Sequence, residues 1–215
     1  MRKQKKELKP IDLTKIKTYP IKKRKNLVNI GQFGKPIELK SFNKFIDSLP
    51  KVLAADGLRN VISNIVKAHN KNRQVVLAIG AHVIKCGLSP IVIDLMKRGI
   101  VTAVAMNGSG AIHDYEMSLI GETSEDVSHS LKDGTFGMAK ETAEAIQAAA
   151  SVPESGLGRA LGNKILKDKN KYKQHSILAE GARLNIPVTV HVAIGTDIIH
   201  MHPCVSGSEM GESSH

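Results

Sequence analysis

The chain of 215 residues is poor in several residue types, and each scarcity excludes a class of protein. It has only two cysteines, Cys86 and Cys204, which excludes a disulfide-stabilised small domain and fits a reducing cytoplasm. Aromatic residues make up 3% of the sequence and tryptophan is absent, so the core must be aliphatic. No run of roughly 18 apolar residues occurs, and the basic N-terminus lacks the apolar segment of a secretory signal. We therefore expect a cytoplasmic protein outside the membrane, with both cysteines buried.

Positive charge is concentrated at one end of the chain. The formal net charge is +11, and residues 1–25 hold eleven Lys or Arg and two acids, which gives +9 and leaves +2 for the rest. We therefore divide the chain into a basic arm, residues 1–27, and a nearly neutral domain, residues 28–215. The arm has one aromatic residue, Tyr19, and no RNA-binding motif. This composition favours packing against a neighbouring subunit over binding nucleic acid.

Hydrophobic periodicity predicts that strands and helices alternate. A continuous run rich in β-branched residues predicts a strand buried on both faces over 75–79, and further runs predict a second buried strand over 100–106 and a third strand over 186–195. Ser89 and Pro90 predict the N-cap and first residue of a helix that ends at Gly99. Other helices are expected over 57–70, 112–120, 136–150, 156–168 and 173–185, and no strand or helix is expected beyond residue 203.

This alternation predicts an α/β fold: a Rossmann-like open, mostly parallel sheet with helices on both faces. Ligands of such sheets bind beyond the carboxyl ends of the strands. The three loops that leave those ends carry most of the polar residues of interest. They are GAHVIKCG, NGSGAIHDYE and GTDIIHMHP. We therefore expect one binding crevice where the three turns meet.

Two of these loops suit a dinucleotide. Asn107, Gly108, Ser109 and Gly110 stand between a strand and a helix, where glycines allow a ligand to approach closely and free helix amides favour phosphate. The loop that begins at Gly80 offers a similar turn. Neither loop matches GxGxxG or a P-loop, and tight turns from strand to helix need glycine in any case.

Titratable side chains follow the second loop's glycines. His113 and Asp114 are candidates for general acid/base catalysis, and together with Glu116 for holding a cationic substrate. Carboxylates near the start of a helix also offset its dipole, and this is the alternative role of Asp114 and Glu116.

The third loop carries a cluster of histidines. Asp197, His200 and His202 could bind zinc or another transition metal, because residues two apart face the same side of an extended segment. A catalytic metal needs about three ligands, and His191 or residues from other turns would have to complete the set. We favour one wall of a dinucleotide crevice over a metal-dependent hydrolase.

The chain resembles the deoxyhypusine synthase family, and most closely the bacterial deoxyhypusine-synthase-like proteins. The resemblance lies in PIDLTKIKTYP, GAHVIKCGLSPIVIDLMKRGIVTAVAMNGSGAIHDYE, GETSEDV and IPVTVHVAIGTDIIHMHP. It implies a Rossmann-like domain that binds NAD, a homotetramer, and NAD-dependent transfer of an aminobutyl-type group from an amine or polyamine. It also implies NAD contacts at Gly80, Ala81, His82, Lys85 and residues 107–110, and matches Asp197 and His202 to an Asp and a His of the family's third loop.

Two departures from the family bear on activity. The family has two glutamates, suited to a cationic polyamine, where this chain has Ile112 and His113. The resemblance also places the catalytic lysine beyond residue 215. The domain is therefore expected to lack its C-terminal part, which a separate polypeptide could supply. The alternative is a non-catalytic or split remnant that keeps the nucleotide-binding fold.

Overall fold

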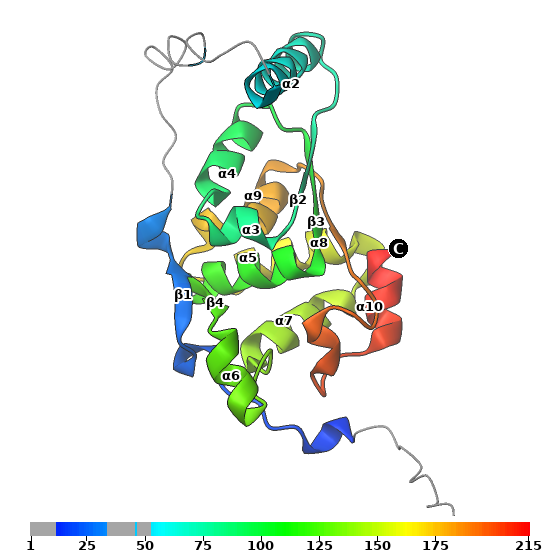
Figure 1. Cartoon of the computed structure of the whole chain (residues 1–215). Helices are drawn as coiled ribbons and strands as arrows, with labels where there is room; N and C mark the ends of the chain where they lie inside the picture. The colour runs from blue at the N-terminus through cyan, green and yellow to red at the C-terminus, as the bar shows by residue number, and fades with distance from the viewer. Residues whose placement is uncertain (1–11, 34–45, 47–52) are drawn as a thin grey trace, which may run out of the picture.

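The centre of the molecule is a parallel sheet of three strands. The computed structural model describes residues 12–33, 46 and 53–215, so residues 1–11 of the arm lie outside the described part. The strands lie in the order β2 (Val76–Ile79), β3 (Ala103–Asn107) and β5 (Val188–His191). Flanking helices surround this sheet (Figure 1). The predicted Rossmann-like open α/β fold is therefore confirmed.

The register of the sheet separates a core face from an outer face. Val104 pairs with Leu77 and Val188, and these side chains point into the aliphatic core. On the opposite face, Val76 is 62% exposed, and Thr189 is also exposed. The prediction that the strand over 75–79 is buried on both faces is therefore wrong for β2. In this sheet β2 and β5 are edge strands, and only β3 has a neighbour on each side.

Nine α-helices are described around the sheet. They are α2 (Leu53–Asn70), α3 (Ala81–Lys85), α4 (Ser89–Lys97), α5 (Gly108–Ile120), α6 (Val127–Asp133), α7 (Lys140–Ala150), α8 (Leu157–Lys167), α9 (Ile177–Leu184) and α10 (Gly207–Ser214). Short 3-10 helices cover Leu13–Lys15, Ile21–Lys23, Ile30–Gln32, Pro153–Ser155, Lys173–His175 and Ile198–Met201. The helix α10 contradicts the expectation that nothing regular follows the third loop. The helices α3 and α6 were not predicted.

The start of α5 differs from its prediction in a way that matters for the site. Gly108 to Gly110 form the first turn of the helix, where a loop was expected. Asn107 is the N-cap, and its Oδ1 accepts a hydrogen bond from Gly110 N at 2.9 Å. The helix ends at Gly121, whose φ of 73° is favourable for glycine.

The helix α4 also begins differently from its prediction. Ser89 is its first residue and makes no capping hydrogen bond, so the prediction of Ser89 as N-cap is wrong. Leu88 takes the N-cap position and Pro90 lies within the first turn, which a residue without a backbone N–H tolerates.

The described part of the basic arm packs on its own chain. The strand β1 (Asn26–Asn29) pairs antiparallel with β4 (Glu122–Glu125), and the predicted boundary at residue 27 falls inside β1. Upstream, Tyr19 N donates to Met138 O at 3.2 Å, and Lys140 N donates to Tyr19 O at 3.0 Å. Figure 1 shows this segment, in blue, along β4 and below α6. The described part of the arm, residues 12–27, is therefore held by hydrogen bonds within its own chain.

Two expectations from composition concern cysteine and the membrane. Cys86 and Cys204 are exposed free thiols, so the expectation that both are buried is wrong. Cys86 lies at the C-cap of α3, at the end of the helix and outside the core. Among the helices of the described ranges, none has the length and apolar character needed to cross a bilayer.

Close packing of α8 on the sheet depends on glycine. A Cβ atom at Gly158 would lie 1.9 Å from Val188 O, and backbone cannot move away cheaply. We expect Gly158→Ala to lower the free energy of unfolding by about 1–3 kcal/mol, measured by urea denaturation. Gly57→Ala is the matched control, because Gly57 also lies in a helix but has no atom within 4 Å of a Cβ. Equal stability of the two variants would contradict this packing.

Candidate functional site

The three predicted turns meet at the carboxyl edge of the sheet. A Cβ atom at Gly80, after β2, would lie 3.8 Å from Asn107 Nδ2, at the end of β3. A Cβ atom at Gly108 would lie only 2.1 Å from Asp197 Oδ2, in the loop after β5. The expectation that these three turns meet at one edge of the sheet is therefore confirmed.

Two polar side chains of the protein lie at the N-terminus of α5. Asn107 caps Gly110 N, and the Asp197 carboxylate lies against Gly108 while accepting a hydrogen bond from Ala193 N at 3.0 Å. A carboxylate at this position repels phosphate, so the expectation of a phosphate site at this helix is not supported. A carboxylate suits a ribose hydroxyl, which donates a hydrogen bond.

A cavity of about 230 Å³ lies beside these turns. It is bounded by α5, the β4–α6 segment, the start of α7, the third loop and the arm. Its polar lining comprises Arg24, Lys85, Ser109, His113, Glu116, Ser124, Glu125 and Thr142; its apolar lining comprises Ile112, Val127, Phe136, Gly137, Ala139, Ile198 and Ile199. An apolar pocket with a few convergent polar groups is the usual form of a small-molecule site.

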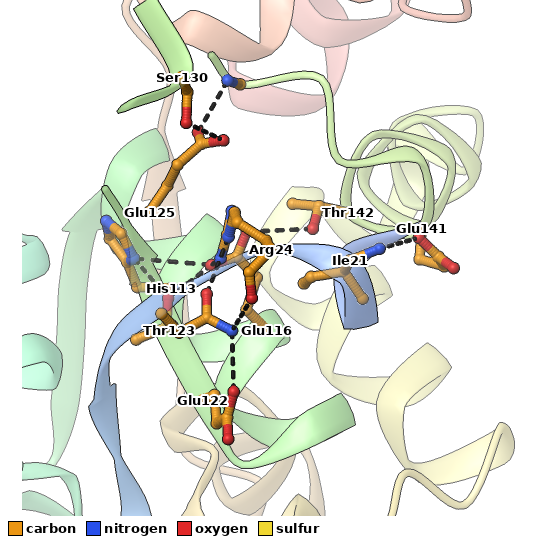
Figure 2. Close-up of polar contacts among 12 residues, drawn as sticks. Ile21, Arg24, His113, Glu116, Glu122, Thr123, Glu125, Ser130, Glu141 and Thr142 are labelled. Atoms are coloured by element: carbon orange, nitrogen blue, oxygen red, sulfur yellow. Dashed lines mark hydrogen bonds and ion pairs between the residues drawn. The ribbon is translucent and has the colours of Figure 1, made fainter. Parts of the chain in front are cut away.

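Glu116 is the most densely hydrogen-bonded carboxylate of the pocket, and Figure 2 shows its partners. Arg24 of the arm forms a bidentate ion pair with it, at 3.0 Å from Nη1 to Oε1 and 2.6 Å from Nη2 to Oε2. Thr123 Oγ1 donates to Oε2 at 2.5 Å, and Thr142 Oγ1 donates to Oε1 at 3.1 Å. Only 1% of Glu116 is exposed. Its charge is therefore neutralised inside the protein.

His113 is held as a neutral imidazole. Burial lowers the pKa of His113 to about 4, although the nearby Glu116 carboxylate opposes the shift. Its Nδ1 lies 2.6 Å from Thr123 Oγ1, whose own proton goes to Glu116. His113 therefore donates from Nδ1, and Nε2 carries the lone pair. Nε2 has no hydrogen-bond partner among the described residues, so it can accept a hydrogen bond from a ligand.

Glu125 is a buried carboxylate whose hydrogen-bond donors are all neutral, although the Arg24 guanidinium is near enough to interact with its charge. It accepts hydrogen bonds from the Tyr19 hydroxyl, from Ser130 Oγ at 3.0 Å and from Gly137 N at 2.9 Å. Burial and the Glu125 carboxylate raise the pKa of Tyr19, which keeps its hydroxyl proton. Within the described ranges, no Lys, Arg or His forms an ion pair with Glu125, which is 8% exposed. The carboxylate can therefore receive one more donor.

Asp114 is placed away from the role predicted for it. Its carboxylate accepts hydrogen bonds from Ser176 Oγ at 2.5 Å and from the backbone N–H groups of Ile177 and Leu178, at 2.8 and 3.1 Å. These groups form the start of α9, and Asp114 is fully buried. The structure therefore favours a structural role for Asp114, as a cap of α9, over contact with substrate.

The histidines of the third loop do not form a metal site. Nε2 of His200 and Nε2 of His202 are both buried without a hydrogen-bond partner in the described part of the chain. His191 contacts Thr189 on the exposed face of β5. In residues 12–33, 46 and 53–215, no three His, Cys, Asp or Glu side chains are grouped so that they could hold a metal ion. The geometry gives the metal-dependent hydrolase no support.

Sequence reasoning missed several residues of the pocket. Arg24 was assigned to a solvated arm, and Thr123 and Glu125 were noted only as part of GETSEDV. Of the predicted cofactor residues, His82 and Asn107 are exposed at the edge of the sheet, while Lys85 and Ser109 line the cavity. The alternation of polar residues in GETSED was a usable signal, since one face of an extended segment points inward.

Comparison with known proteins leaves the family open. No protein-family model and no curated protein matches the chain. Among solved structures, it is similar to the apo crystal structure of ArgZ, described as an arginine dihydrolase from the ornithine-ammonia cycle in Cyanobacteria, at 20% identity and a TM-score of 0.44. The match covers 64% of this chain and 18% of the ArgZ chain. We draw no conclusion about activity from a likeness this weak.

The pKa of His113 makes stability depend on pH. Because its folded pKa of about 4 is below the ordinary 6.5, the unfolded chain binds more protons between these values, and stability rises with pH across that window. Over this window the free energy of unfolding of the wild type should rise by about 3 kcal/mol, and in His113→Gln this rise should be absent. The measurement is urea unfolding at successive pH values. An unchanged pH profile in the variant would contradict a buried neutral His113.

The pKa of Asp114 predicts the opposite slope. Burial raises it from 3.8 to about 6, so the folded chain binds more protons between these values and stability falls as pH rises through them. Over that window Asp114 should lower the free energy of unfolding of the wild type by about 2–3 kcal/mol, and in Asp114→Asn this decrease should be absent. The same series of unfolding measurements tests both variants. The two substitutions should change the pH dependence of stability in opposite directions, and a change in the same direction would refute one of the two pKa shifts.

Proposed function

We propose that the protein is a deoxyhypusine-synthase-like, NAD-dependent transferase that acts on an amine. The observation that carries the proposal is Glu125, a buried carboxylate of the pocket that has only neutral hydrogen-bond donors. An ammonium group would supply a positive charge and N–H donors to pair with this carboxylate. The homotetramer and the cytoplasmic location that the resemblance and composition suggest belong to the same proposal.

The apolar part of the pocket supports an alkylamine. Ile112, Phe136 and Ile198 line the same cavity as Glu125, and they suit a hydrocarbon chain. His113 lies on α5 in the same lining, with Nε2 unoccupied. We assign Glu125 to binding the ammonium group and Nε2 of His113 to accepting a hydrogen bond from it, while the proton that the amine loses on oxidation passes to water.

The turns at the edge of the sheet fit part of NAD. Gly80, His82 and Lys85 would hold its phosphates, because the turn is open and Lys85 is cationic. Asp197 would accept a ribose hydroxyl beside Gly108. When bound, NAD supplies the acceptor for a hydride from the carbon next to the amine nitrogen. Thr123 and Glu116 fix the tautomer of His113 so that Nε2 remains a hydrogen-bond acceptor.

The proposal is tested with the full chain, NAD and a panel of primary amines. We expect NAD to bind, as followed by calorimetry, and NADH to form only when an amine is present. Glu125→Gln should raise KM for the amine at least about tenfold, because a charge-assisted hydrogen bond is lost, and should leave the Kd for NAD unchanged.

Glu122→Gln is the matched control, since Glu122 lies on the same strand but is exposed. It should leave both constants unchanged. Failure to bind NAD would end the proposal. NAD binding without amine-dependent NADH would instead support a remnant that keeps the nucleotide-binding fold.

A further inference from the structure

We propose that the pocket takes an amine with a single positive charge, and that Arg24 of the N-terminal arm enforces this specificity. The inference rests on the proposed function, and it names the substrate class of the same site. It also makes Arg24 a specificity-determining residue, although local sequence gave it no role.

The pocket contains two buried carboxylates, but only one is available to a cation. Glu116 is covered by the bidentate Arg24 pair and by two threonine hydroxyls, which together occupy both of its oxygens. Glu125 has three neutral donors, and a carboxylate has about four acceptor positions. One ammonium group can therefore be paired at Glu125 without displacing a protein group.

A second ammonium group would meet positive charge. Arg24 and Lys85 both line the cavity, and His113, which is neutral, does not offset their positive charge. Only 7% of the Arg24 side chain is exposed, so solvent screens its charge weakly. A dication would have to leave one ammonium beside Arg24 or break the Arg24–Glu116 pair, and both outcomes cost binding free energy.

Arg24 therefore occupies the place that a second ammonium group would take. It reaches Glu116 from the segment between the 3-10 helix Ile21–Lys23 and β1 (Figure 2). The segment is fixed on both sides, by Ile21 N donating to Glu141 at 2.9 Å and by the β1–β4 ladder. The guanidinium is thus a permanent part of the pocket wall.

The test compares a monoamine with the diamine of the same chain length. Calorimetry with butylamine and putrescine measures binding directly, without turnover. We expect the wild-type chain to bind butylamine at least about tenfold more tightly than putrescine, because the second ammonium meets like charge. Arg24→Gln should reverse the preference, since Glu116 then lacks a cationic partner and can receive the second ammonium.

Two further variants keep the test decisive. Arg24→Gln/Glu116→Gln removes both charges and should restore the preference for butylamine. Arg24→Lys keeps the charge and should behave like the wild type, which is informative if Arg24→Gln does not fold by circular dichroism. Equal binding of both amines by the wild type, binding of neither, or a preference that no Arg24 variant alters would overturn the inference.

The outcomes also separate this inference from the proposed function. Butylamine binding without NADH formation would end the proposed transferase and leave the specificity of the pocket standing. NADH formation from putrescine but not from butylamine would leave the transferase standing and overturn the inference.

Discussion

The buried carboxylate of Glu116 is the group on which the arrangement of the pocket depends. Its four donors come from three separate parts of the chain: Arg24 in the arm, Thr123 in β4 and Thr142 in α7. A buried charge without such partners costs several kcal/mol. The network is therefore stable only when all three parts are in place around α5. It fixes the path of the arm, which in turn brings Tyr19 to Glu125.

The pairing of β2, β3 and β5 supplies the second constraint. Parallel strands present their carboxyl ends at one edge, so Gly80, Asn107 and Asp197 come together although they are far apart in sequence. Because Gly108 has no Cβ atom, the third loop can approach the start of α5 closely, and a Cβ there would lie 2.1 Å from Asp197 Oδ2. Asp197 takes the position at the start of α5, and this selects hydroxyl groups over phosphate there.

The sequence predicted what local patterns determine. Apolar runs located all three parallel strands, and helical spacing located α2, α7, α8 and α9, because burial repeats with the period of the element. Strand ends followed by glycine predicted the crevice. The first turn of α5 was taken for a loop, since Gly108 and Gly110 have low helix propensity that the Asn107 cap offsets.

The sequence could not predict contacts whose partners lie far away. Arg24 and Glu116 are 92 positions apart, and Tyr19 and Glu125 are 106 positions apart. Residues 1–25 hold eleven basic residues, and no local pattern distinguishes Arg24, whose side chain is buried, from the others. Asp114 shows the converse. It stands among candidate catalytic residues, yet its hydrogen bonds go to α9, 62 to 64 positions later.

The long-range pairing of the arm with α5 also has a consequence for biosynthesis. A ribosome releases residues from the N-terminus onward, so Arg24 leaves the exit tunnel long before Glu116, Thr123 and Thr142 have been made. During that interval the guanidinium has no carboxylate to pair with, and the arm remains in solvent. The wall of the pocket can close only after α7 has emerged. Assembly of this site is therefore a late, long-range event, delayed by the loop that must be closed.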